Sequence, residues 1–218
     1  MLSHYFRFLS FTCVVLLTTQ ALFANQTATT TPILPQTSLP FSVSIEQLPF
    51  TLPSGIHSGA SAIYHNKWLF IAGRTNGLHT FNPGNNNFPP SQQNTIVYVV
   101  DPATQTVYSR DLKDAASGLT QEQIDQLSVT SPQYYRVGST LYLCGGYGVE
   151  TATGLFSTKS VLTAIDLPGL MNWVIKGKVK DTAAKHIRQT THPLLQVTGG
   201  SLAILNKHLT AQLIFGQN

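Results

Sequence analysis

The chain has 218 residues, of which 42% are hydrophobic, so it is long enough and apolar enough to build a core, and a disordered protein is not expected. Charged residues make up only 10% and the formal net charge is +4, which excludes the strongly basic surface typical of nucleic-acid-binding proteins. Glycine, proline, asparagine, serine and threonine are plentiful, which predicts many short strands joined by turns.

The chain begins with the pattern of a signal peptide. Residues 1–24 combine a basic start at Arg7, an apolar stretch and a candidate cleavage point after Ala24. Leu22 is larger than the small residue preferred at its position, so an uncleaved membrane anchor stays open as the alternative. After cleavage Cys144 is the only cysteine, which excludes an intrachain disulfide. We therefore expect a secreted or periplasmic protein, and export without disulfides favours a bacterial one.

Two segments precede the repeated part of the chain. Residues 25–40 are rich in threonine and proline and have no period, so we expect a disordered, flexible lead-in. Residues 41–48 alternate the apolar side chains of Phe41, Val43 and Ile45 with polar ones, which predicts a half-buried strand.

One β-hairpin pattern then recurs three times. Residues 58–74 align without gaps with residues 131–147, and each copy has a strand, a two-residue turn and a second strand that ends at glycine. A third copy has its turn at residues 206–208 and reaches Gly216. Similarity at a nearly fixed spacing is the sequence signature of a repeat fold.

Two more strands are expected after each of the first two hairpins. In both copies an apolar run ends in an aspartate followed closely by proline, at Asp101 and at Asp166. An aromatic residue, Tyr108 in the first copy and Trp173 in the second, opens the last short strand. Repeated units of four strands are typical of propeller blades.

One short helix is expected between the first two units, over residues 121–127. Thr120 and Gln123 form a capping box, and Ile124 and Leu127 give the segment a small apolar face. We expect this helix to be an excursion between blades rather than a core element.

The stretch LYLCGGY, residues 141–147, followed by an aromatic-anchored outer strand, resembles the kelch repeat of galactose-oxidase-like β-propellers. Residues 69–74 and 209–216 look like weaker copies, in which Ala72 and Phe215 replace the first glycine. The resemblance implies an all-β fold: a partial β-propeller of four-stranded antiparallel blades, about two and a half in number, with one short inter-blade helix.

The expected propeller covers residues 41–218, with units at about 55–115, 128–180 and 190–218. Such a set cannot close a ring, because closed propellers have typically about four to eight blades. Three accounts stay open. The chain is the N-terminal part of a longer protein, several copies oligomerise through open sheet edges to complete a ring, or the units pack as an open β structure.

The double glycine raises the question of a phosphate-binding loop. Such a loop needs backbone N–H groups at a helix N-terminus, whereas residues 149–160 lack a helical period and lead into another strand. We interpret Gly145 and Gly146 as positions that permit a tight backbone path where strands crowd together.

No catalytic, cofactor-binding or metal-binding set is predicted. The histidines of the mature chain show neither the HxH nor the HxxxH spacing that zinc and copper sites favour. The copper and tyrosine radical of galactose oxidase have no matching motif, and no nucleophile elbow is present. Cys144 lies in an apolar strand, where a thiol is usually buried.

The best polar cluster for a ligand lies on loops, which carry the binding residues of a propeller. It consists of His57, Arg74, Asn76 and His79, and an ordinary network of turn hydrogen bonds is the alternative. We expect a binding module for a glycan or protein ligand, with no nucleic-acid partner and no membrane contact unless the leader stays uncleaved. The alternative function is the N-terminal part of a propeller enzyme acting on carbohydrate, whose catalytic residues lie in missing blades.

Overall fold

The computed structural model describes residues 41–77, 87–177, 180–204 and 212–214. The chain divides into two units, Met1–Glu46 and Gln47–Asn218. The described residues of the first unit form no helix or strand, and Ile45 is 95% exposed. The strand predicted over residues 41–48 is therefore wrong, because no described strand pairs with this segment and its apolar side chains are exposed.

The first sheet of the second unit has four antiparallel strands in the order β1-β2-β3-β4. They are β1 (Ala60–Tyr64), β2 (Lys67–Ile71), β3 (Ile96–Asp101) and β4 (Thr106–Asp111). The predicted turn between β1 and β2 is confirmed: His65 and Asn66 both have positive φ, 46° and 60°, the conformation that suits the twist of a two-residue hairpin.

The second sheet has the order β10-β9-β6-β5 and is also antiparallel. Its strands are β5 (Gln133–Val137), β6 (Thr140–Cys144), β9 (Val161–Asp166) and β10 (Ile187–Thr191). The prediction of two four-stranded antiparallel sheets is confirmed. The second sheet extends past residue 180, where the corresponding predicted unit ends, because β10 supplies its fourth strand.

The stretch that contains Trp173 is a helix, not the predicted outer strand. Helix α2 (Leu167–Lys176) begins directly after β9, and the side chain of Asp166 caps it by accepting a hydrogen bond from the amide of Gly169 at 3.1 Å. Pro168 stands in the first turn, where its fixed φ suits a helix and its missing N–H costs nothing. The Asp-Leu-Pro pattern therefore begins a helix here, whereas Asp101-Pro102 opens a turn.

The remaining elements connect or extend the two sheets. Helix α1 (Gln121–Leu127) has the predicted capping box between Thr120 and Gln123. The hairpin of β7 (Tyr147–Glu150) and β8 (Leu155–Thr158) lies between β6 and β9 in sequence, and β11 (Leu202–Ile204) pairs with β12 (Gln212–Ile214). Short 3-10 turns occur at Pro90–Gln92, Ala115–Ser117, Ala183–His186 and Pro193–Leu195.

The described part of the chain is thus mostly β but not all-β, because it contains two α-helices where one was expected. No sheet of the described residues closes on itself. The turn predicted at residues 206–208 lies outside the described residues, as does Gly216. None of the helices in the described part of the chain is long and apolar enough to cross a membrane.

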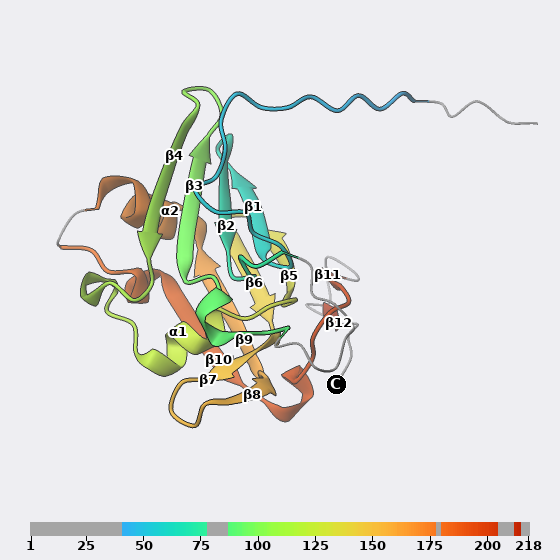
Figure 1. Cartoon of the computed structure of the whole chain (residues 1–218), viewed down its shortest axis with the longest axis vertical. Helices are drawn as coiled ribbons and strands as arrows, with labels where there is room; N and C mark the ends of the chain where they lie inside the picture. Colours follow the sequence, from blue (N-terminus) through green and yellow to red (C-terminus); the bar gives the residue numbers. More distant parts are fainter. Residues whose placement is uncertain (1–40, 78–86, 178–179, 205–211, 215–218) are drawn as a thin grey trace, which may run out of the picture. The chain divides into compact units, whose positions relative to one another are not determined.

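The core is one apolar cluster formed by the two sheets and both helices, of which α2 lies against β3 and β4 (Figure 1). Helix α1 contributes Ile124 and Leu127, so the prediction that it is an excursion rather than a core element is wrong. The first sheet contributes Leu69, Ile71, Val97 and Val99, and the second contributes Leu141, Leu143, Ile165 and Ile187. These are alternate residues of their strands, as expected when one face of a sheet is buried. Trp173 is 1% exposed in this cluster, so this aromatic residue is a core residue of α2 and does not open a strand as predicted.

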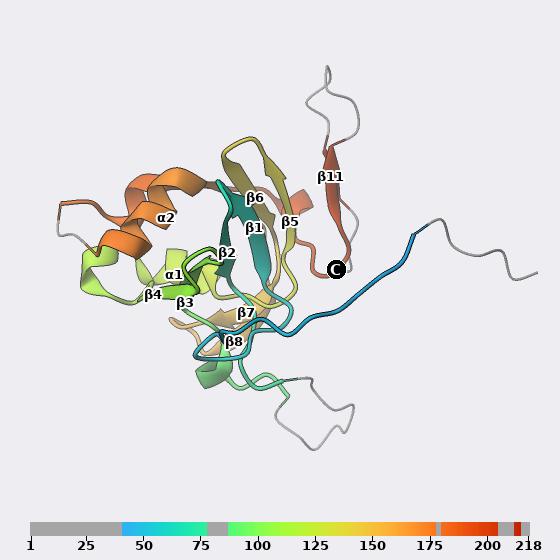
Figure 2. The same ribbon diagram turned by 90° about the horizontal axis from the view of Figure 1, so that it is seen from above.

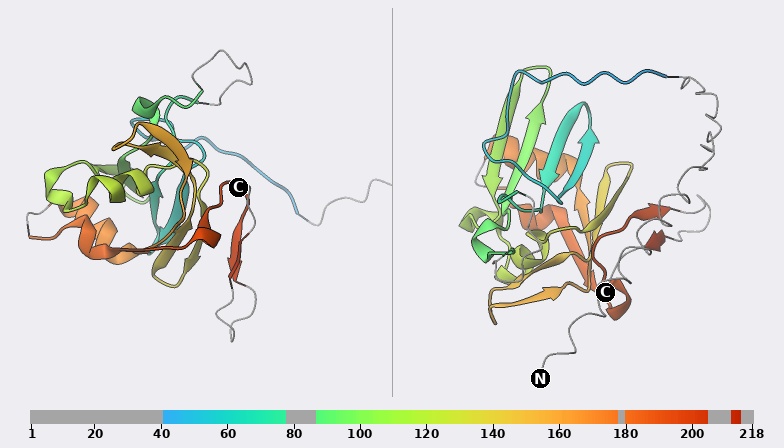
Figure 3. Two further views of the ribbon diagram at one scale, coloured as in Figure 1. Left: turned by 90° about the horizontal axis from the view of Figure 1, so that it is seen from below. Right: turned by 45° about the vertical axis from the view of Figure 1, so that its right-hand side comes forward.

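The first strands of the successive sheets lie side by side: β1 is next to β5, and β5 is next to β11 (Figures 2 and 3). Backbone bonds join the segments that lead into them. The amide of Ser131 donates to the carbonyl of Ser58 at 2.7 Å, and the amide of Gly199 donates to the carbonyl of Ser131 at 2.9 Å. All three residues have positive φ, 54°, 52° and 67°, so each sheet is preceded by a residue in the left-handed region.

The double glycine, Gly145-Gly146, also has positive φ values that match those of the aligned residues in the first copy. Gly145 and Gly146 have φ of 63° and 95°, and the aligned Ala72 and Gly73 have φ of 62° and 86°. A Cβ on Gly146 would approach a methyl of Val129 to 2.5 Å, and strand β7 rather than a helix follows. The interpretation as a tight backbone path is confirmed.

Candidate functional site

The predicted loop cluster is centred on Arg74, which follows β2. Its backbone exchanges two hydrogen bonds with His57, both 3.0 Å, and its side chain is buried. The guanidinium Nη1 donates to the carbonyl of Asn87 at 2.6 Å, and the amide of Asn76 reaches the same carbonyl at 3.5 Å. The structure thus brings His57, Arg74 and Asn76 together, whereas His79 lies outside the described residues.

Arg74 also begins a row of stacked side chains. Its guanidinium lies over the ring of Phe88 at 4.2 Å. Phe88 meets Tyr147 edge-on at 5.5 Å, and Tyr147 stacks on Phe156 at 5.6 Å between ring centroids. The row joins the loops of the first sheet to the β7–β8 hairpin, so Arg74 acts in packing, which favours the turn-network alternative.

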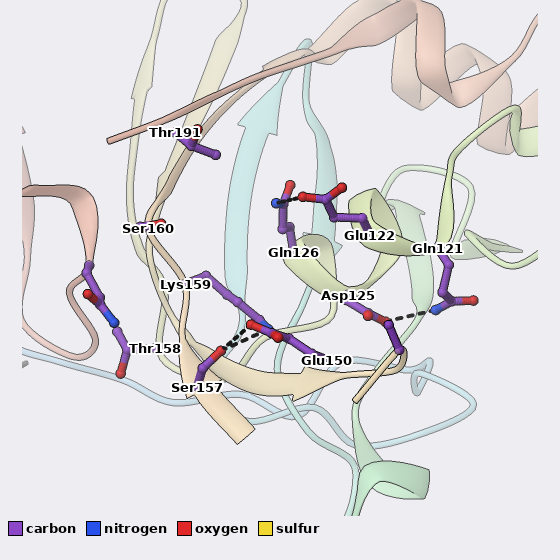
Figure 4. A pocket seen from close by; sticks show the side chains of 12 residues that line it. Gln121, Glu122, Asp125, Gln126, Glu150, Ser157, Thr158, Lys159, Ser160 and Thr191 are labelled. Carbon is purple, nitrogen blue, oxygen red and sulfur yellow. Dashed lines mark hydrogen bonds and ion pairs between the residues drawn. The ribbon is translucent and has the colours of Figure 1, made fainter. Parts of the chain in front are cut away.

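A second candidate site is a polar hollow at one end of the second sheet (Figure 4). Its volume is about 480 Å³, within the range of small-molecule sites. Helix α1, the β7–β8 hairpin, the link between β8 and β9, the end of β10 and the turn that follows it surround the hollow. The lining residues are Gln121, Glu122, Asp125, Gln126, Glu150, Ala152, Ser157, Thr158, Lys159, Ser160, Thr191 and Gln196.

At one wall of this hollow, Asp125 joins helix α1 to the β7–β8 hairpin. Its carboxylate accepts hydrogen bonds from the amide and the hydroxyl of Thr151, both at 2.7 Å, and from the side-chain amide of Gln121 at 2.8 Å. The carboxylate is buried, and three donors compensate for its loss of water. The hairpin is thereby held against the helix, and Asp125 has a structural role.

Glu150, Ser157 and Lys159 form the charged part of the hollow. Ser157 donates to Glu150 Oε1 at 2.8 Å, and Lys159 Nζ lies 3.4 Å from the same oxygen and 3.2 Å from the Ser157 hydroxyl. These contacts, the serine bond first, lower the pKa of Glu150, so it is ionised at neutral pH. The Lys159 side chain is 7% exposed and that of Glu150 is 49% exposed.

The chemistry of the hollow is that of a polar binding site. Amides, hydroxyls and carboxylates supply donors and acceptors, and Ala152 is the one apolar side chain among the lining residues. Among the described residues, no group of three or more histidine, cysteine, aspartate or glutamate side chains is arranged so that it could hold a metal ion. Cys144 is buried, and burial raises its pKa to about 11, so it fits the predicted packing role.

Sequence reasoning did not find the hollow. It located α1 but did not identify the β7–β8 hairpin, although Thr153-Gly154 carries a turn signal, with Gly154 at a φ of 70°. The hydrogen bonds between Asp125 and Thr151 are tertiary contacts, which local sequence patterns do not predict.

Comparison with known proteins gives no family for the chain. No model of a protein family matches it, and no curated protein matches it. The interpretation of the site therefore rests on its own geometry.

Proposed function

We propose that the chain forms successive blades of a kelch-like β-propeller and serves as a secreted or periplasmic binding module of a bacterium. The observation that supports this proposal most strongly is a backbone hydrogen bond that recurs between neighbouring sheets. The amide of Gly73 donates to the carbonyl of Val129 at 2.7 Å, and the amide of Gly146 donates to that of Val197 at 2.7 Å. The second sheet thus relates to the next segment as the first sheet relates to the second, which a radial repeat requires.

The outer faces of the two sheets support the same proposal. A sheet at the outside of a sandwich carries polar residues on its exposed face. Here the face of the first sheet that turns away from the shared core carries Ile63, Trp68, Phe70, Tyr98 and Val100. The corresponding face of the second sheet carries Tyr135, Val137, Tyr142, Leu162 and Ala164. Apolar residues on both faces are expected of sheets that stack on two sides, as blades do.

The hollow is the proposed binding site, because it gathers hydrogen-bonding side chains on loops and on an inserted hairpin while two sheets supply rigidity. A glycan or a protein segment rich in polar groups fits this lining. Export by the N-terminal leader places such a ligand outside the cytoplasm.

The test is a binding screen of the purified chain against glycan and peptide arrays. Ala152→Trp fills the hollow from the β7–β8 turn, and the matched control Ala103→Trp places the same side chain in the exposed β3–β4 turn. We expect a bound ligand that is lost in the first variant and kept in the second. A screen without ligand, or a ligand that Ala152→Trp binds unchanged, would overturn the proposal for this site.

A further inference from the structure

We infer that the hollow selects neutral or amine-bearing glycans and rejects acidic ones. This inference rests on the proposed function and concerns the same site. It follows from how the charges of the lining residues are arranged.

The ammonium of Lys159 is the one basic group among the described lining residues. The Lys159 side chain is 7% exposed, and its ammonium is already engaged with Glu150 and Ser157 (Figure 4). A ligand carboxylate that paired with Lys159 would have to compete with the Glu150 carboxylate for an ammonium group on a buried side chain. The hollow therefore offers an acidic ligand no free counter-charge.

The carboxylates act in the opposite direction. Glu122 is exposed at the hollow, and its contact with the Gln126 amide, at 3.4 Å, is long. Glu150 is held ionised, and only its Oε1 carries the contacts with Ser157 and Lys159. Three carboxylates face one ammonium in the lining, although the chain as a whole has a net charge of +4. An anionic ligand is repelled at close range, where like charges cost most.

The remaining side chains suit sugar hydroxyl groups. Gln126 and Gln196 offer both donors and acceptors, and Thr158, Ser160 and Thr191 offer hydroxyls. A glycan thus meets partners around its ring, and an amino group on the glycan meets Glu122 or Glu150. Attraction to hydroxyls and repulsion of carboxylates together give selectivity.

Titration calorimetry with three oligosaccharides of the same linkage tests the inference: one built from glucose, one from glucosamine and one from glucuronic acid. We expect the glucuronic acid compound to bind at least about tenfold more weakly than the glucose compound, and the glucosamine compound to bind most tightly. Added salt should reduce the differences in affinity among the three compounds, because it screens the exposed carboxylates.

Glu122→Gln removes one exposed carboxylate with little structural disturbance, and the double variant with Glu150→Gln removes two. Both variants should reduce the difference in affinity between the glucose and the glucuronic acid compound. Glu46→Gln, outside the lining, should leave this difference unchanged. Acidic glycans that bind as well as neutral ones would overturn this inference and leave the proposed function standing. Failure of all three compounds to bind would contradict glycan binding at the hollow itself.

Discussion

The amide of Gly73 bonds to the carbonyl of Val129 at 2.7 Å, and this bond joins the end of one hairpin to the segment that enters the next sheet. Gly146 makes the equivalent bond to Val197 at the same distance. Both glycines have positive φ, 86° and 95°, a conformation that residues with a Cβ adopt only with strain. The close approach of backbones at these positions explains why the repeated hairpins end in glycine.

Gly146→Ala is expected to lower the free energy of unfolding by about 2–4 kcal/mol, because the new methyl adds a clash with Val129 to the strain of a positive φ. Gly154→Ala is the matched control: its φ is 70°, but a Cβ there meets nothing within 4 Å. Gly154→Ala should lower the free energy of unfolding by only about 1 kcal/mol. Equal losses in chemical denaturation would contradict the close approach.

Arg74→Ala is expected to destabilise the protein by about 2–4 kcal/mol, because it removes a fully buried side chain and leaves the carbonyl of Asn87 without its 2.6 Å partner. Arg188→Ala, at an exposed position on β10, is the control and should change stability little. An unchanged unfolding midpoint for Arg74→Ala would contradict the packing role of Arg74 and would favour the alternative, a role in ligand binding.

Asp125→Asn should lower stability by about 1–3 kcal/mol, since an amide cannot accept all three hydrogen bonds from Thr151 and Gln121. Hydrogen exchange should report the loss locally, as faster exchange of amides in β7 and β8. Glu122→Gln on the same helix is exposed and serves as the control. Loss spread evenly over the chain would contradict a local anchoring role.

The hairpins were predictable because they depend on local signals. Alternating apolar residues and a two-residue turn fix β1, β2, β5 and β6, and the capping box at Thr120 fixes the start of α1. Gly145-Gly146 was also interpreted correctly, since nothing after it has a helical period.

The errors arose where one pattern fits two structures. The similarity of Asp166-Leu167-Pro168 to Asp101-Pro102 predicts a strand after the proline, whereas Leu170 and Val174 have the spacing of one helix face and bury that face of α2. Residues 41–48 alternate like a strand, but a strand also needs a partner, and alternation does not supply one.

Stability should fall in acid. Hydrogen bonds from Ser157, Lys67 and His186 lower the pKa values of Glu150, Asp101 and Asp181 in the folded state. A lowered folded pKa gives stability that is present above the ordinary values of 4.5 for glutamate and 3.8 for aspartate, and that is lost as the pH falls through the folded values.

Melting temperatures measured from neutral pH down to about pH 3 test this expectation. The melting temperature should decline below the ordinary carboxylate range, and Glu150→Gln should make the decline shallower than in the unchanged chain. A melting temperature that is flat or rises over this range would show that these carboxylates are not held ionised by their partners.

The radial arrangement of successive sheets is tested most directly by nuclear Overhauser contacts in an isotopically labelled chain. We predict contacts from the amide of Ser131 to residue 58 and from the amide of Gly199 to residue 131, without paired contacts along β1 and β5. A continuous ladder of backbone contacts between β1 and β5 would show one uninterrupted sheet and would contradict the account.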